Sequence, residues 1–147
     1  MAAANARKMT AVDTNVIIAL WDRDPAVSAY AQKALDHELA HGSLVLSAPV
    51  FTELMAAPGR SEGFLTKFCN DTGITVEFDL DEQIWRTAGR AFQAYASRRR
   101  KQRDPGPRRI LADFLIGAHA FQRGYHLLTL DGQIYKTAFP NLTIIEI

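Results

Sequence analysis

The chain has 147 residues, of which 48% are hydrophobic, and its formal net charge is +1. This length predicts one domain over residues 1–147 with a core of its own. No apolar run approaches the ~18 residues of a membrane span, and the N-terminus lacks a secretory signal pattern, so we expect no membrane segment. The single cysteine, Cys69, excludes an internal disulfide framework and favours a cytoplasmic protein.

Short apolar runs alternate with helical patterns along the whole chain. Strands are expected at 9–13, 44–47, 74–78, 125–130 and 142–147. Helices are expected at 14–21, 24–41, from 49 to the Pro58-Gly59 break, from there to about 71, and at 81–101, 110–121 and 133–138. The strands are apolar throughout and are separated by helices, which indicates an α/β domain with a mainly parallel sheet.

The helix expected at 110–121 is almost wholly apolar, with only Asp113 and His119 polar. A helix that is apolar on nearly every face belongs inside a domain. A carboxylate there is costly unless a cation or hydrogen bonds compensate it. Asp113 is therefore either a functional charge pushed into the interior or a first-turn acid favoured by the helix dipole.

Four acidic residues are expected at one edge of the sheet. Asp13 and Asp131 end strands, Glu53 lies in the helix after the second strand, and Asp113 starts the apolar helix. In such folds, sites form at the carboxyl ends of the strands. Each acid alone is explained by a helix cap, a turn or a solvated surface. Together they would repel one another, so a hard divalent cation is the simplest partner.

Four segments resemble, in order, the acidic motifs of the PIN-domain nucleases, and in particular of the toxin ribonucleases of VapBC toxin–antitoxin pairs: AVDTN at 11–15, TEL at 52–54, ADFLIGAHA at 112–120 and LLTLD at 127–131. The Arg-rich segment before Asp113 and the Phe139-Pro140 pair also resemble that toxin family. The resemblance implies a PIN-like three-layer α/β sandwich with a mainly parallel five-stranded sheet flanked by helices. It also implies an acidic quartet with two supporting residues: Asp13, Glu53, Asp113 and Asp131, with Asn15 and Thr129.

The function implied is that of an Mg²⁺- or Mn²⁺-dependent endoribonuclease, the toxin of a type II pair, which uses metal-activated water. We expect Asp13 and Asp113 to be the primary metal ligands. Asp131 would complete the site directly or through water, and Glu53 would ligate or orient the attacking water. The resemblance also implies a small antitoxin partner and a homodimer. Four aromatic residues could supply apolar surface for that dimer or could equally be core: Trp21, Phe64, Phe68 and Trp85.

Residues 97–109 carry a local net charge of +6, which leaves −5 for the rest of the chain. The seven basic residues are Arg98, Arg99, Arg100, Lys101, Arg103, Arg108 and Arg109. An acidic site repels nucleic acid, so this segment is the natural element to contact RNA phosphates. The alternative is a solvated helix end whose cations complement the helix dipole.

Three other functions remain open. His37-Glu38-Leu39-Ala40-His41 is a literal H-E-x-x-H, the pattern of zinc metallopeptidases, for which His119 or His126 could be a third ligand. That interpretation leaves the four acids unexplained. The others keep the PIN-like fold, as an RNA-processing nuclease with no antitoxin or as a module that binds RNA without cutting it.

Overall fold

The computed structural model describes residues 8–102 and 108–147. Its strands are β1 (Lys8–Val12), β2 (Gly42–Ser47), β3 (Thr75–Glu77), β4 (His126–Thr129) and β5 (Ile144–Glu146). Its helices are α1 (Thr14–Leu20), α2 (Pro25–His41), α3 (Ala48–Met55), α4 (Glu62–Thr72), α5 (Glu82–Lys101), α6 (Leu111–Arg123) and α7 (Gly132–Ala138). In these two ranges no helix is long and apolar enough to cross a membrane.

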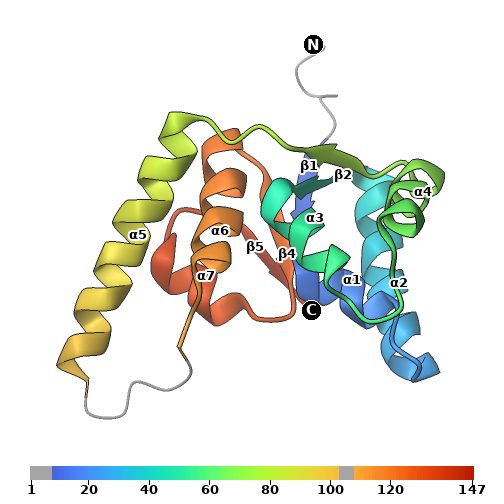
Figure 1. The fold of residues 1–147 in the computed structure, drawn as a ribbon, viewed down its shortest axis with the longest axis horizontal. Coiled ribbons are helices and arrows are strands. Elements are labelled where there is room, and N and C mark those ends of the chain that lie inside the picture. Colours follow the sequence, from blue (N-terminus) through green and yellow to red (C-terminus); the bar gives the residue numbers. More distant parts are fainter. Residues whose placement is uncertain (1–7, 103–107) are drawn as a thin grey trace.

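The strands form one five-stranded sheet in the order β3-β2-β1-β4-β5, and every pair is parallel. In Figure 1, α5 and α6 lie side by side at one flank of the strands and α1 and α2 at the other. The predicted α/β fold with a parallel sheet sandwiched by helices is therefore confirmed. Because β1 and β4 are central neighbours, the residues that follow them lie next to one another at the carboxyl edge of the sheet.

The interior of the sheet follows from its uninterrupted apolar runs. Leu44, Val45 and Leu46 of β2 are all at most 1% exposed, as expected for a parallel strand covered on both faces. β2 begins two residues earlier than predicted, at Gly42. A Cβ there would lie on the main-chain carbonyl of Lys8, so glycine lets β1 and β2 pair from their first residues.

Of the four aromatic residues that could be either surface or core, two lie on the surface. Phe64 of α4 is 41% exposed and Trp85 of α5 is 50% exposed. Helical spacing identifies an apolar stripe, but it does not say which side of a broad stripe meets the core. The buried residues of α5 are Ile84, Thr87, Ala88 and Ala91. Two of them are alanines, whose small side chains let α5 approach α6 closely.

Of the two alternatives for Asp113, an interior charge or a first-turn acid, the structure favours the second. The buried part of α6 is 114–120, whereas Asp113 in the first turn is only half-buried and neighbouring Leu111 is 46% exposed. Its Oδ2 accepts a hydrogen bond from the main-chain N–H of Ile110 at 3.2 Å, as a first-turn acid does. The most deeply buried of the four predicted acids is Asp13, at 6% exposure.

Candidate active site

The four acids converge on one cavity of about 360 Å³ at the carboxyl edge of the sheet. Asp13 follows β1, Glu53 comes from α3, Asp113 from the first turn of α6, and Asp131 from the residue before α7. Five further residues line the cavity: Thr14, Asn15, Ile18, Ile134 and Tyr135. The topology thus gathers carboxylates that are up to 118 positions apart in the sequence.

Asp13 is held by donors on both carboxylate oxygens. Oδ1 accepts from the N–H of Thr14 at 2.8 Å, which caps α1, and Oδ2 accepts from the hydroxyl of Thr129 at 2.8 Å. Tyr135 adds a side-chain hydrogen bond. Burial nevertheless raises the pKa of Asp13 to about 6, with a smaller upward contribution from the charge of Asp113. The anion is well oriented, but no cation among the described residues contributes to stabilising it.

The two residues predicted to support the site, Asn15 and Thr129, are linked to each other and to the acids. The Asn15 amide donates to the Thr129 hydroxyl oxygen at 3.4 Å, and its carbonyl oxygen accepts from the N–H of Leu130 at 3.1 Å. The N–H of Asp131 also donates to the Thr129 oxygen, at 3.0 Å. One hydroxyl therefore connects the position of Asp131 to the orientation of Asp13.

Two residues of this network have no counterpart among the sequence predictions. The hydroxyl of Thr14 donates to Glu53 Oε1 at 2.6 Å, which ties α3 to the start of α1. Tyr135 is 1% exposed, and burial together with the charges of Asp13 and Asp113 raises its pKa, so it stays a neutral donor. The only signal for Tyr135 is its position four residues after Asp131, one turn along the same helix face.

Of the basic segment, Arg109 reaches the acids. Its Nη1 lies 2.7 Å from Asp131 Oδ2. The residues Arg98, Arg99, Arg100 and Lys101 form the last turn of α5. Arg108 is exposed beside Arg109, and Arg103 lies outside the described residues. Asp113, whose pKa is raised by burial and by the charge of Asp131, also feels the opposing charge of Arg109.

The donor set of the cavity fits a hydrated divalent cation. Within residues 8–102 and 108–147, no three His, Cys, Asp or Glu side chains are close enough together to form a ready metal cage. Mg²⁺ does not require one, because it keeps several waters and is usually held by one or two carboxylates. Four carboxylates line this cavity, and the raised pKa values of Asp13 and Asp113 show that their charges are under-compensated.

The H-E-x-x-H segment is used differently. Glu38 is 5% exposed and bonds to Lys8 at 3.2 Å, to the Thr10 hydroxyl at 3.3 Å and to His37 Nδ1 at 3.1 Å. A glutamate with these partners is not free to act as the general base of a peptidase. His119, one nominated third ligand, bonds through Nε2 to Glu77 at 2.8 Å.

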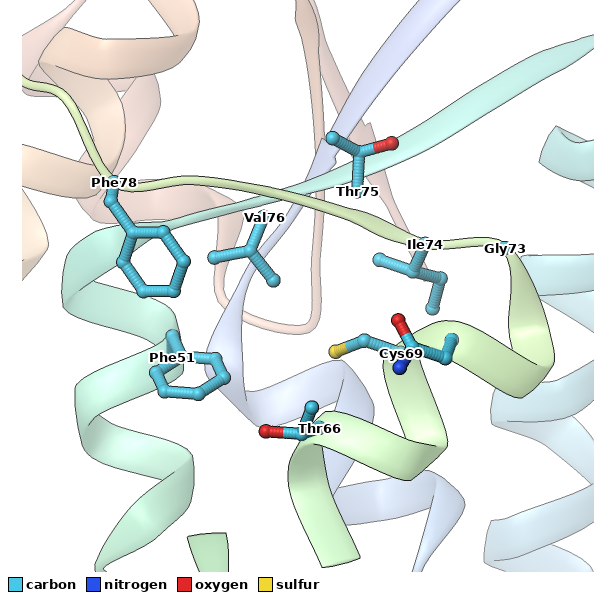
Figure 2. Close-up of a pocket in the computed structure, with 9 residues that line it drawn as sticks. Phe51, Thr66, Cys69, Gly73, Ile74, Thr75, Val76 and Phe78 are labelled. Atoms are coloured by element: carbon cyan, nitrogen blue, oxygen red, sulfur yellow. The ribbon is translucent and has the colours of Figure 1, made fainter. Parts of the chain in front are cut away.

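A larger hollow of about 510 Å³ lies between α3, α4 and β3 (Figure 2). Its lining combines apolar side chains with polar ones such as Asn70, and Figure 2 shows the Cys69 sulfur turned toward the space between Phe51 and Val76. Burial raises the pKa of the Cys69 thiol, which makes it a poor nucleophile. This hollow is larger than the acidic cavity, but no carboxylate lines it, whereas four line the acidic cavity.

The overall architecture is shared with solved toxin–antitoxin structures. VapBC2 from Rickettsia felis, bound to a DNA fragment from its promoter, matches with TM-score 0.68, 15% identity and coverage of 94% of this chain and 98% of that one. VapBC-1 from nontypeable Haemophilus influenzae matches with TM-score 0.64, 21% identity and coverage of 94% and 97%. A toxin–antitoxin complex from Klebsiella pneumoniae matches with TM-score 0.63, 18% identity and coverage of 94% and 99%.

A comparison with curated proteins finds no match. The family model of the PIN domain matches residues 10–140, a span that includes all four acids and both sides of the basic segment. The chain belongs to the PIN domain family.

Proposed function

We propose that the protein is a metal-dependent endoribonuclease and the toxin of a toxin–antitoxin pair. The observation that carries the proposal is the meeting of Asp13, Glu53, Asp113 and Asp131 in one cavity, with the pKa values of Asp13 and Asp113 raised. PIN nucleases generally use a divalent metal, and Mg²⁺ or Mn²⁺ suits these oxygen ligands. Such an ion supplies an activated water and neutralises charge on the phosphoryl group.

The chain's own residues would bind and orient the reacting groups. Asp13 and Asp113 would hold the ion, because they are the two carboxylates whose charges burial leaves least compensated. Thr129 and the N–H of Thr14 fix the plane of the Asp13 carboxylate. Glu53, which accepts a hydrogen bond from the Thr14 hydroxyl and lines the cavity, would orient a water molecule, and Asp131 would complete the site.

The test is cleavage of single-stranded RNA with Mg²⁺, with Mn²⁺ and with EDTA. Wild type should cut only with metal, and Asp113→Asn should lose at least about 10²-fold in rate, since it removes a ligand charge where transition-state charge develops. His37→Ala is the matched control on α2, and it should cleave as wild type does. An active Asp113→Asn variant together with an inactive His37→Ala variant would show that the acidic cavity is not the active site.

The toxin assignment rests on the solved toxin–antitoxin complexes that share the fold. We propose a small partner protein that inhibits cleavage by placing a basic side chain among the four acids, because a guanidinium matches paired carboxylates. Copurification with the product of the adjacent gene, followed by the cleavage assay, tests this. If no neighbour binds or inhibits, the toxin role is wrong while the nuclease role stands, as expected for an RNA-processing enzyme.

A further inference from the structure

Arg109 is fixed at both its main chain and its side chain. Its N–H donates to the hydroxyl of Tyr95 on α5 at 2.7 Å, and its guanidinium donates to Asp131 at 2.7 Å. The side chain is 28% exposed, and that of Asp131 is 43% exposed. The pair is thus partly shielded from water but still reachable by a ligand. The next residue back, Arg108, is exposed.

The ion pair stands at the boundary between two hollows. On one side is the acidic cavity, lined by Asp131. On the other is a hollow of about 260 Å³ between the end of α5 and α7, which Arg109 lines together with basic and amide side chains: Arg98, Arg99, Gln102 and Gln133. Ile134 lines both hollows, so they adjoin. The basic hollow offers the guanidinium and amide donors that bind phosphate oxygens.

This geometry sets up a competition for Asp131. A carboxylate bonded to a guanidinium is a weaker ligand for a divalent cation, because the two positive charges repel and share one acceptor. A phosphate that enters the basic hollow competes for the same guanidinium from the opposite side. The positive charge of Arg109 also acts on Asp113: it lowers the pKa of that carboxyl, whereas burial raises it. Arg109 is therefore positioned to act on both the metal and the nucleic acid.

We propose that Arg109 is an exchangeable cation of the active site: it occupies Asp131 in the RNA-free protein and transfers to a backbone phosphate when RNA fills the basic hollow, which frees Asp131 for the metal. This inference rests on the proposed nuclease function. It makes the bindings of metal and RNA mutually favourable, and thermodynamic linkage requires each to strengthen the other by the same factor. Arg109 then acts as a positioning residue that strengthens metal binding when substrate is present.

The experiment measures Mn²⁺ affinity by calorimetry, with and without a short phosphorothioate RNA whose integrity is checked afterwards. For wild type, the RNA should tighten Mn²⁺ binding by a factor within the usual range of roughly 5–150 for coupled sites. Arg109→Gln should bind Mn²⁺ more tightly without RNA, by about tenfold, and its coupling factor should fall close to one. Arg109→Gln should also reduce the log–log salt slope of RNA binding by somewhat under ~1.

Arg108→Gln is the matched control, since it removes an adjacent exposed charge and should leave the Mn²⁺ affinity without RNA unchanged. Tyr95→Phe is the second variant: it removes the acceptor that holds the Arg109 main chain, so its coupling factor should fall between those of wild type and Arg109→Gln. Unchanged or weaker Mn²⁺ binding in Arg109→Gln, or no coupling in wild type, would show that Arg109 is only a fixed brace for Asp131. If wild type shows no coupling but still cleaves RNA, only the proposed exchange of Arg109 is wrong. If wild type neither binds Mn²⁺ nor cleaves RNA, the nuclease proposal is wrong as well.

Discussion

Asp13 and Glu38 have nearly the same low solvent exposure, although Asp13 is packed more deeply, and they differ in the stability of their charges. Asp13 is 6% exposed and Glu38 is 5% exposed, and both accept a hydrogen bond from a threonine of the sheet. Burial raises the pKa of Asp13 to about 6. Burial also acts upward on Glu38, but hydrogen bonds from His37 and Lys8 and the Lys8 charge outweigh it, so the pKa of Glu38 is lowered.

The contrast separates a carboxylate whose charge the fold compensates from one whose charge it leaves uncompensated. A buried charge with a cation beside it is compensated within the fold and joins two elements, here β1 and α2. A buried charge with hydroxyl and amide donors but no cation is held in a fixed orientation and lowers the stability of the fold. Such a charge is suited to binding a cation. The H-E-x-x-H motif belongs to the first class and Asp13 to the second.

The largest expected effect is a pair of substitutions with opposite signs. In EDTA at neutral pH, Asp13→Asn should stabilise the protein by up to about 3 kcal/mol, the value of a shift of about two pKa units in a buried group. Glu38→Gln should destabilise it by about 1–3 kcal/mol, because Lys8 loses its anionic partner. Urea unfolding of the three proteins measures both. Two changes of the same sign would contradict the distinction.

The pH dependence of these differences follows from the directions of the shifts. The folded pKa of Asp13 is above its unfolded value, so its ionised form costs stability that appears as pH rises from about 4 through 6. The advantage of Asp13→Asn should therefore vanish below about pH 4. The folded pKa of Glu38 is lowered, so its stabilising contribution is present above its ordinary value of 4.5 and is lost as pH falls below that. Unfolding curves at pH 4 and 7.5 test both signs.

Bound metal should offset the loss of stability caused by the buried charge of Asp13, and it should not change the contribution of Glu38 to stability. At a free Mn²⁺ concentration ten times the dissociation constant, wild type should gain about 1.4 kcal/mol of stability. Glu38→Gln should gain the same amount, whereas Asp13→Asn should gain much less because a ligand is missing. Thermal unfolding with and without Mn²⁺ shows the gain as a rise in Tm. An equal rise in all three proteins would place the bound metal elsewhere.

The sequence was sufficient to predict the strands and the meeting of the acids. Unbroken apolar runs such as Leu44–Leu46 indicate covered strands, and parallel topology then brings Asp13 and Asp131 to one edge. The sequence was not sufficient to predict that Trp85 is exposed, because its exposure depends on the rotation of α5 relative to α6. The sequence also could not predict the hydrogen bond between Arg109 and Asp131, because this bond depends on the three-dimensional positions of residues 22 apart in the chain.

Depth of burial was the property least visible in the sequence. Asp113 lies in the most apolar segment, yet the first turn of α6 opens toward solvent and leaves it half-buried. Asp13 lies in an ordinary strand–helix turn, yet Thr129 and Tyr135 from distant parts of the chain cover it. Local composition therefore does not show which acid is buried, because the covering side chains come from elements far away in the sequence.

The smallest expected effect distinguishes the two threonines that donate to these carboxylates. Thr10→Val removes a 3.3 Å hydrogen bond from Glu38, which keeps Lys8 and His37, so the loss should be about 0.5 kcal/mol. Thr129→Val removes a 2.8 Å bond from Asp13 and also the acceptor for the N–H of Asp131, so its loss should be larger by about 1 kcal/mol.

The difference between the two threonine variants should itself depend on pH, since the Thr129 hydroxyl donates to a carboxylate that is charged only above about pH 6. In EDTA the excess loss in Thr129→Val should be full at pH 7.5 and smaller at pH 5, where Asp13 is protonated and can itself donate a hydrogen bond. The loss in Thr10→Val should be the same at both, because the pKa of Glu38 is lowered and its charge persists. Urea unfolding at the two pH values measures all four changes. Equal losses at both pH values in Thr129→Val would mean that Asp13 is ionised at both. In that case the burial of Asp13 would not destabilise the folded protein, and a bound cation would have no such destabilisation to offset.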